Sequence, residues 1–285
     1  MALAVSCGDD GRMVETGRQM RKIAEGREAE VFAWDDGRVL KLYRNDGYAP
    51  NAQYEAAGLR AARSAGGIVP EPGDEVRVQD RPGLLMERVE GEDLLALLGK
   101  KPWLMFRAGT VLGETHARLH EAVAPPELRS LHERLIRSIE RGASEAPEYA
   151  HLAAFALDVL QSLPEGDRLL HGDFHPGQVL MTARGPVVID WPNATRGDPH
   201  ADVARTLLML DIASVPPGTP LAVRRLQGIG RGIVRARYIA AYRKARPLDE
   251  ELLARWRIPV AAQRLTDGIE DERETLLRML EREGG

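Results

Sequence analysis

One loop near the middle of the chain constrains the fold and its chemistry most. Residues 171–178 read His-Gly-Asp-Phe-His-Pro-Gly-Gln, and the apolar run 187–189 then ends at Asp190. Two carboxylates and an amide thus gather around a Gly/Pro-bearing loop between short apolar segments. Phosphoryl transfer needs one carboxylate to orient a hydroxyl and hard oxygen ligands to hold Mg²⁺ on nucleotide phosphates. The pattern predicts Asp173 at a reaction centre, with Gln178 and Asp190 as candidate metal ligands.

The bulk composition narrows the classes of protein that the chain can represent. Its 285 residues, 44% hydrophobic and 29% charged, suffice for one large domain or two coupled lobes. The net charge of −4 argues against a nucleic-acid-binding surface over the whole chain. Cys7 is the single cysteine, so it forms no intramolecular disulfide. No apolar run reads as a membrane span or a secretory signal, and we expect a cytoplasmic protein without nucleic-acid or membrane partners.

Strand patterns fill the first third of the chain and helix patterns most of the remainder. Residues 1–20 are weakly patterned and are expected to form an N-terminal extension. Strands are then predicted at residues 22–26, 29–34, 38–43, 75–79 and 84–87. A helix is predicted at 51–64 with Asn51 as its N-cap. Further helices are predicted at 94–98, 103–120, 128–141 and 149–163, a short hairpin at 179–181 and 187–189, and mostly helix from 202 onward.

These motifs, in this order, resemble those of the aminoglycoside phosphotransferases and related small-molecule kinases. Residues 171–178 are similar to the HxDxxxxN catalytic loop of that family, and residues 190–204 to its IDW…A…GDP…DLA run. The resemblance covers roughly residues 23–210. It implies an α+β, two-lobed protein-kinase-like fold, with a small β-rich N-lobe and a larger, mostly helical C-lobe. The implied bounds are 21–86 for the nucleotide-binding N-lobe, 87–91 for a hinge and 92–285 for the C-lobe with the catalytic loop and acceptor site.

The resemblance also implies roles for residues of the N-lobe and hinge. Gly26 lies in the loop that would cover the nucleotide phosphates. Lys41 lies in an apolar strand of a chain with only a handful of lysines, and would act as a point charge on phosphate while pairing with Glu55. The Glu87 carbonyl and the Val89 amide would bind adenine. A surface lysine with a buried stem and a dipole-favoured first-turn glutamate are the alternative interpretations of the pair.

For the C-lobe, the resemblance implies that Asp173 orients the attacking hydroxyl and that His171 supports the loop from behind. Asp190 would be a metal ligand, and Asp202 would anchor the catalytic loop. Gln178 departs from the family, where asparagine is usual; its longer amide still offers an oxygen to Mg²⁺ and mildly favours a sugar-like acceptor.

Two further expectations concern side chains near this loop. Asp198 is expected to cap the helix that begins at Pro199. A zinc site made from His171, His175 and His200 is disfavoured, because the loop spacing is not helical and no cysteine is nearby.

The predicted function is transfer of phosphoryl from ATP, or from GTP, to a hydroxyl of a small molecule, with Mg²⁺ as cofactor. An aminoglycoside or amino sugar is the favoured acceptor, and acidic residues could supply its counter-charges: Asp211, Asp249, Glu250, Glu251, Asp267, Glu270 and Asp271. The segment 267–274 is nevertheless expected to be a solvated helix of Glu/Arg pairs. Alternatives are a kinase-like nucleotide-binding regulator without transfer activity, or a kinase of another small alcohol such as choline. A protein kinase is less favoured, since no Ala-Pro-Glu segment follows Asp190.

Overall fold

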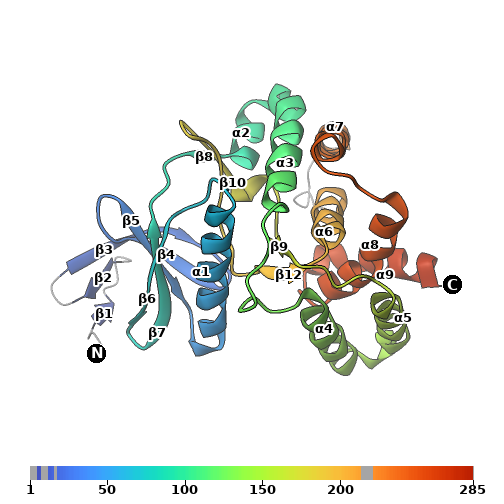
Figure 1. Cartoon of the computed structure of the whole chain (residues 1–285), viewed down its shortest axis with the longest axis horizontal. Coiled ribbons are helices and arrows are strands. Elements are labelled where there is room, and N and C mark those ends of the chain that lie inside the picture. The colour runs from blue at the N-terminus through green and yellow to red at the C-terminus, as the bar shows by residue number, and fades with distance from the viewer. Residues whose placement is uncertain (1–4, 8–11, 16–17, 213–220, 285) are drawn as a thin grey trace.

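A computed structural model of the chain describes residues 5–7, 12–15, 18–212 and 221–284. A strand-rich lobe occupies one end of the molecule and a helical lobe the other (Figure 1). The first strands of the sheet lie at the outer end of the first lobe and the last helix at the outer end of the second. The predicted α+β, two-lobed architecture is confirmed. No helix in the described part of the chain is long and apolar enough to cross a membrane.

A single antiparallel sheet forms the N-lobe, with strand order β1-β2-β3-β4-β5-β7-β6. β3 begins at Arg18, and two strands precede it within the stretch expected as an extension. Residues 1–4, 8–11 and 16–17 of that stretch lie outside the described residues. The strands are β1 Val5–Cys7, β2 Arg12–Glu15, β3 Arg18–Glu25, β4 Ala29–Ala33, β5 Arg38–Tyr43, β6 Pro72–Val78 and β7 Arg81–Glu87.

Side chains of β5 alternate between two different environments, as the period of a strand requires. Leu40 and Leu42 are fully buried in a small core with Phe32. Val39 packs on the other side with the main core, and Lys41 lines the cleft on that same side. The strand thereby directs one charged side chain inward without breaking its apolar packing.

Helix α1, Ala49–Ser64, packs against β6 and β7. The prediction that Asn51 caps it is wrong. The helix begins two residues earlier because Pro50, which has a fixed φ and no N–H to satisfy, occupies its first turn. The side-chain amide of Asn51 instead donates to the Glu28 carboxylate, with Nδ2 2.8 Å from Oε2.

Eight helices in the described residues make up most of the C-lobe, together with two small sheets. The predicted hairpin is confirmed as β10 Val179–Thr182 and β11 Gly185–Val188, which is joined by β8 Glu92–Asp93. β9 Arg168–Leu170 pairs with β12 Thr195–Gly197. The helices are α2 Leu94–Lys100, α3 Met105–Leu119, α4 Leu131–Glu145, α5 Ala150–Gln161, α6 Pro199–Ile212, α7 Leu221–Ala245, α8 Glu250–Leu265 and α9 Glu270–Gly284.

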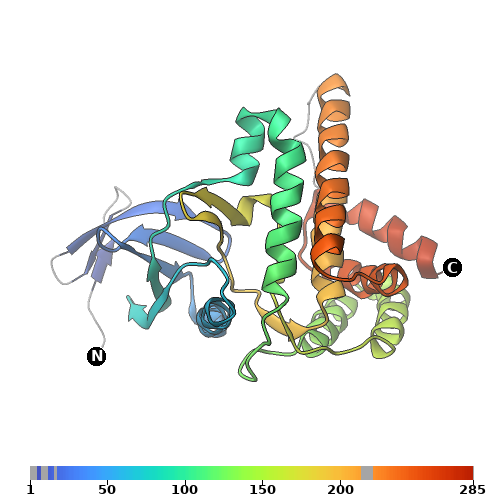
Figure 2. The same cartoon turned by 45° about the horizontal axis from the view of Figure 1, so that its top comes forward.

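Asp198 caps α6 as predicted, because its Oδ1 accepts from the His200 amide at 2.8 Å. Helices α3 and α7 run side by side through the C-lobe (Figure 2). Gly109 and Gly113 make this approach possible. A Cβ on Gly113 would collide with the Tyr238 carbonyl and the Tyr242 amide of α7.

We therefore expect Gly113→Ala to lower the free energy of unfolding by about 1–3 kcal/mol, as for an overpacked core. Gly99→Ala is the matched control. It lies in the last turn of α2 with no atom near its added Cβ, and should be neutral or stabilising by up to about 1 kcal/mol. Urea unfolding followed by circular dichroism measures both. Equal effects would show that α3 and α7 adjust freely to a methyl group.

Candidate active site

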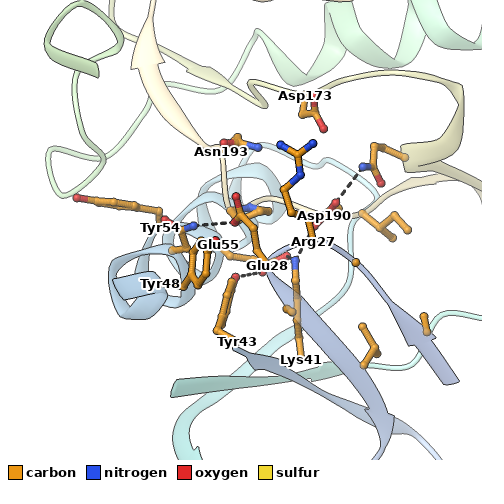
Figure 3. Close-up of a pocket in the computed structure, with 18 of the residues that line it drawn as sticks. Arg27, Glu28, Lys41, Tyr43, Tyr48, Tyr54, Glu55, Asp173, Asp190 and Asn193 are labelled. Atoms are coloured by element: carbon orange, nitrogen blue, oxygen red, sulfur yellow. Dashed lines mark hydrogen bonds and ion pairs between the residues drawn. The ribbon is translucent and has the colours of Figure 1, made fainter. Parts of the chain in front are cut away.

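A cleft of about 1420 Å³ lies between the lobes and is lined by both. Figure 3 shows side chains of both lobes, including Lys41 and Asp173, around this space. The residues predicted from the sequence to contact nucleotide, metal or acceptor all line it: Gly26, Lys41, Glu55, Glu87, Val89, Asp173, Gln178 and Asp190. His171 and Asp202, predicted as structural support, are instead buried behind the loop.

Lys41 is bound between two carboxylates. Its Nζ lies 2.8 Å from Glu55 Oε2 and 2.5 Å from Asp190 Oδ1. Glu55, 1% exposed, also accepts from the Tyr43 hydroxyl at 2.5 Å and from the Trp191 amide at 3.0 Å. Burial alone would lower the pKa of Lys41, but the charges of Asp190 and Glu55 outweigh it and raise this pKa above its ordinary value. Lys41 therefore stays charged.

Asp190 lies just after β11 with φ of 67°, in the left-handed region that aspartate tolerates better than most residues. Its Oδ2 accepts from Gln178 Nε2 at 2.9 Å. Burial raises the pKa of Asp190, yet Lys41 more than offsets this and the net pKa is lowered. A charged carboxylate and an amide thus lie side by side, and both are oxygen donors of the kind that Mg²⁺ prefers.

Backbone hydrogen bonds hold the loop that carries Asp173. His171 Nδ1 accepts from the Asp173 amide at 3.2 Å, and its Nε2 donates to the Ile189 carbonyl at 3.0 Å. Burial lowers the pKa of His171, which fits this neutral tautomer. The His171 and Gly172 amides both donate to Asp202, at 2.6 and 3.0 Å. Gly172 has φ of 77°, so a side chain there would be strained.

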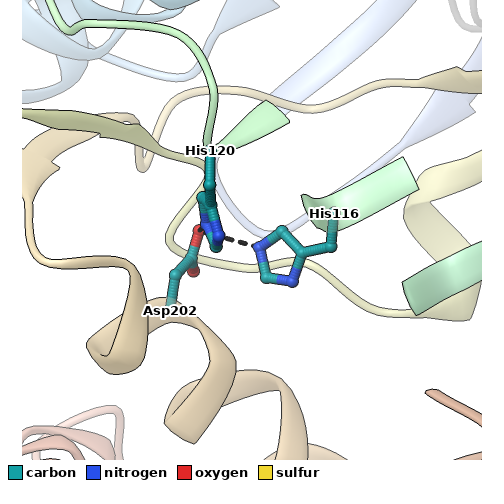
Figure 4. Close-up of side chains that lie close together, drawn as sticks. All are labelled: His116, His120 and Asp202. Carbon is teal, nitrogen blue, oxygen red and sulfur yellow. Dashed lines mark hydrogen bonds and ion pairs between the residues drawn. The ribbon is translucent and has the colours of Figure 1, made fainter. Parts of the chain in front are cut away.

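Asp202 is also the centre of a buried cluster with two histidines of α3 (Figure 4). His116 and His120 place Nε2 at 3.1 and 3.4 Å from Asp202 Oδ2. Their Nδ1 atoms bond the hydroxyls of Tyr238 and Tyr242 on α7, at 2.8 and 2.7 Å. The three side chains are close enough to surround a metal ion. Every ring nitrogen already has a protein partner, however, so the cluster acts as a polar joint between α3, α6 and α7.

The histidines considered for zinc do not come together as a ligand group within the described ranges. His200 Nδ1 bonds Asp198 at 2.7 Å, and its Nε2 accepts from the Asp249 amide. His175 Nδ1 accepts from the Gly177 amide within its own turn. These contacts give each imidazole a local structural partner.

Several arginines that sequence reasoning missed also line the cleft, and Arg205 and Arg27 are the first two considered because both contact Asp267. Arg205, 7% exposed on α6, places Nη2 at 3.6 Å from Asp173 Oδ1 and 3.3 Å from Asp267 Oδ2. Arg27 extends from the loop after β3, and its Nη1 donates to the Asp267 carbonyl across the cleft at 3.1 Å. The signal for Arg205 was its place one turn after Asp202 in an otherwise apolar helix.

The prediction that residues 267–274 form only a solvated helix is wrong at two positions. Asp267 lies before α9 and lines the cleft, where it accepts from Arg205 and Arg264. Glu272 is buried in a two-point pair with Arg264, at 2.7 and 2.9 Å. Helical periodicity alone could not reveal that Arg264 of α8 pairs with both Asp267 and Glu272. Glu274 is solvated as expected and pairs weakly with Arg278.

A β-rich lobe and a helical lobe, with a lysine–glutamate pair and a loop carboxylate facing each other across the cleft, define a two-lobed kinase-like fold. The family comparison agrees with this class. Residues 19–248 match the phosphotransferase enzyme family (APH), and the chain belongs to that family. The resemblance inferred from the motifs is thereby confirmed.

Individual relatives are more distant. Streptomycin 6-kinase of Streptomyces griseus is 30% identical over 193 residues, which cover 62% of this chain and 60% of that protein. The match thus spans less than two thirds of this curated relative. A thermostable mutant of aminoglycoside phosphotransferase APH(4)-Ia, in a ternary complex with ADP and hygromycin B, has a TM-score of 0.65 at 18% identity, covering 93% and 94% of the two chains. A choline/ethanolamine kinase family protein from Mesorhizobium loti has a TM-score of 0.62 at 16% identity, covering 94% and 88%.

The buried joint predicts how stability depends on pH. Burial, with a smaller contribution from His116, lowers the pKa of His120 to about 3 from 6.5. Between these two pH values His120 is protonated in the unfolded chain and neutral in the folded chain. The free energy of unfolding therefore falls as the pH drops below about 6.5. Between pH 7 and 5 this residue should remove about 2 kcal/mol from the free energy of unfolding. Urea unfolding at both pH values measures the loss.

His120→Gln should be less stable at pH 7 but should lose about 2 kcal/mol less on acidification. His151→Gln, at an exposed position of α5, should leave the pH dependence of the wild type unchanged. If both variants keep the wild-type dependence, His120 is not the group responsible.

Proposed function

We propose that the protein is an ATP- and Mg²⁺-dependent O-phosphotransferase that acts on a hydroxyl group of a small molecule. The observation that carries the proposal is the convergence in one cleft of the Lys41–Glu55 pair, the Asp190–Gln178 pair and Asp173. These are the charge types that phosphoryl transfer requires: a fixed cation for phosphate, oxygen donors for a metal and a carboxylate for the nucleophile. Membership of the phosphotransferase family supports it.

In this proposal the nucleotide lies toward the N-lobe side of the cleft. The backbone of Glu87 and Val89 binds the adenine, and the turn at Gly26 covers the phosphates. Lys41 offsets phosphate charge while Glu55 holds it in position. Gln178 and Asp190 would hold Mg²⁺, which supplies neutralisation of the developing charge on the phosphates.

Asp173 orients the acceptor and receives its proton. The hydroxyl oxygen forms a bond to the terminal phosphorus as the bond from that phosphorus to the bridging oxygen breaks, so ADP leaves and a phosphate ester results. Asp173 takes the hydroxyl proton in this step and returns it to solvent. His171 and Asp202 keep the loop backbone in place through the hydrogen bonds described above, and Asp173 thereby keeps its position.

An aminoglycoside or amino sugar is the acceptor that the relatives' names suggest, since those names include streptomycin and hygromycin B. Of the seven acidic residues considered as counter-charges, Asp267 alone lines the cleft. It is already shared by Arg205 and Arg264. Asp211 pairs with Arg235 and Arg257 instead, and Asp249 caps α8. These acidic residues therefore give little support to a polycationic acceptor.

The test is acceptor-stimulated ADP release with Mg-ATP across a panel of sugars, sugar acids, sugar phosphates, aminoglycosides and choline. We expect Asp173→Asn to lower the stimulated rate by roughly 10²–10⁴, the size of a general-base contribution, and to leave Mg-AMP-PNP affinity unchanged. Asp36→Asn, on an exposed turn, is the control and should match the wild type.

Tight nucleotide binding with no stimulation by any acceptor, and no effect of Asp173→Asn, would instead favour a kinase-like regulator without transfer activity. A protein that binds no nucleotide would contradict the proposal altogether.

A further inference from the structure

Arginine dominates the C-lobe wall of the cleft. Six arginines of this lobe line the cleft, against three carboxylates of the same lobe, Asp173, Asp190 and Asp267. Asp190 is already paired with Lys41 from the other lobe. The arginines come from the loop before α4, from α4, from α6 and from α8: Arg129, Arg134, Arg137, Arg141, Arg205 and Arg264.

Local carboxylates offset three of these charges, most weakly that of Arg141, whose Nε lies 4.0 Å from Glu145 Oε1 on the same helix. Arg264 forms its two-point pair with Glu272 and also lies 3.1 Å from Asp267. Arg205 lies between Asp267 and Asp173. The wall next to Asp267 is therefore close to neutral, and the remaining positive charge lies on the α4 side.

Arg129 and Arg134 bond only to uncharged groups. Arg129 Nη2 donates to the Pro192 carbonyl at 3.1 Å, and its guanidinium lies 4.6 Å from the centre of the Tyr54 ring. Arg134 donates to the carbonyl and the side-chain oxygen of Asn193, at 3.2 and 2.7 Å. These bonds fix the loop after Asp190, but a neutral donor could make them as well. The positive charges of Arg129 and Arg134 are therefore not needed to hold this loop.

Arg137 extends the same charge along α4. Residues 134, 137 and 141 fall on one face of the helix by their spacing. The Nε of Arg137 donates to the Glu133 carbonyl of its own helix. In the part of the chain that the structure describes, none of Arg129, Arg134 and Arg137 forms an ion pair with a carboxylate.

These like charges oppose one another. Burial, followed by repulsion from Arg129 and Arg205, lowers the pKa of Arg134 to about 9, which still leaves it charged at neutral pH. Burial likewise lowers the pKa of Arg129. The Nε atoms of Arg129 and Arg205 are buried and lack a partner among the described residues. A bound anion would relieve the repulsion, because a guanidinium presents a donor fork that matches carboxylate and phosphate oxygens.

We propose that the acceptor is an anion, with a carboxylate or phosphate group held by Arg129, Arg134 and Arg137 while its hydroxyl reaches Asp173. The inference rests on the proposed function and names the charge class of its acceptor. An aminoglycoside would bring several positive charges against the same wall, so it is the wrong class of substrate for this chain. Nucleotide phosphates do not account for the wall, because the groups proposed to act on them, Lys41 and Gln178, contact Asp190, whereas Arg129 and Arg134 bond to Pro192 and Asn193 further along the chain.

The test uses radiolabelled sulfate as the probe, in equilibrium dialysis at constant ionic strength, with the full chain saturated with Mg-AMP-PNP. We expect sulfate to bind beside the nucleotide, and Arg137→Gln to weaken it by roughly ten-fold, the loss of one charged hydrogen-bonding group. Arg137 is exposed and bonds only its own helix, so this variant should fold. Arg134→Gln should weaken sulfate binding at least as much. Arg107→Gln, exposed on α3 outside the cleft, should match the wild type.

Sulfate affinity that is unchanged in both α4 variants would overturn the proposal. So would sulfate that competes with AMP-PNP instead of binding beside it, since the arginines would then serve the nucleotide. Streptomycin that binds the Mg-AMP-PNP complex, and binds tighter in Arg137→Gln, would also overturn it. The sulfate titration is repeated without nucleotide. If the protein binds sulfate but no nucleotide, the proposed function is contradicted, and the titration without nucleotide still tests the anion site.

Discussion

A buried ammonium shared between the two lobes is the interaction on which the cleft depends. Lys41 comes from the N-lobe sheet, Glu55 from α1 and Asp190 from the C-lobe. A charge with so little exposure is stable only when it is paired and hydrogen-bonded. Glu55 meets this requirement from both sides, because it also accepts from Tyr43 in the same sheet and from the Trp191 amide of the other lobe. The relative position of the lobes is thus tied to one carboxylate.

The same principle fixes the loop that carries Asp173, with the opposite charge at its centre. Asp202 is buried and collects two backbone amides of the loop and two imidazoles of α3. Burial would raise its pKa, but the hydrogen bonds from His116 and His120 outweigh that effect and hold it well below the ordinary value. Tyr238 and Tyr242 extend this joint to α7. The described residues of the α3–α7 pair do not line the cleft but support the reaction centre through Asp202.

Local sequence signals were sufficient where one short segment determines the structure. The strand pattern at residues 38–43 predicted the element that carries Lys41, and the order of motifs predicted which residues would meet in the cleft. The signals failed where partners come from distant segments. Nothing near His116 or His120 shows that Asp202 will lie between them, and nothing near Asp267 shows that Arg205 will. The prediction for the start of α1 was wrong for a local reason. It gave more weight to the capping preference of Asn51 than to the preference of Pro50 for the first turn of a helix.

The two partners of Lys41 differ in a way that bears on the proposed function. The Glu55 side chain is 1% exposed and that of Asp190 39% exposed, so solvent screens only the second pair. Removing one member of a fully buried pair costs about 3–5 kcal/mol, and solvent screening on the Asp190 side makes the part-buried Lys41–Asp190 pair the less costly one to break. Glu55 is therefore the permanent partner and Asp190 the exchangeable one. Under the proposed function, a nucleotide in the cleft would draw Lys41 toward its phosphates and leave Asp190 available to hold a metal ion, while the buried Lys41–Glu55 pair stays intact.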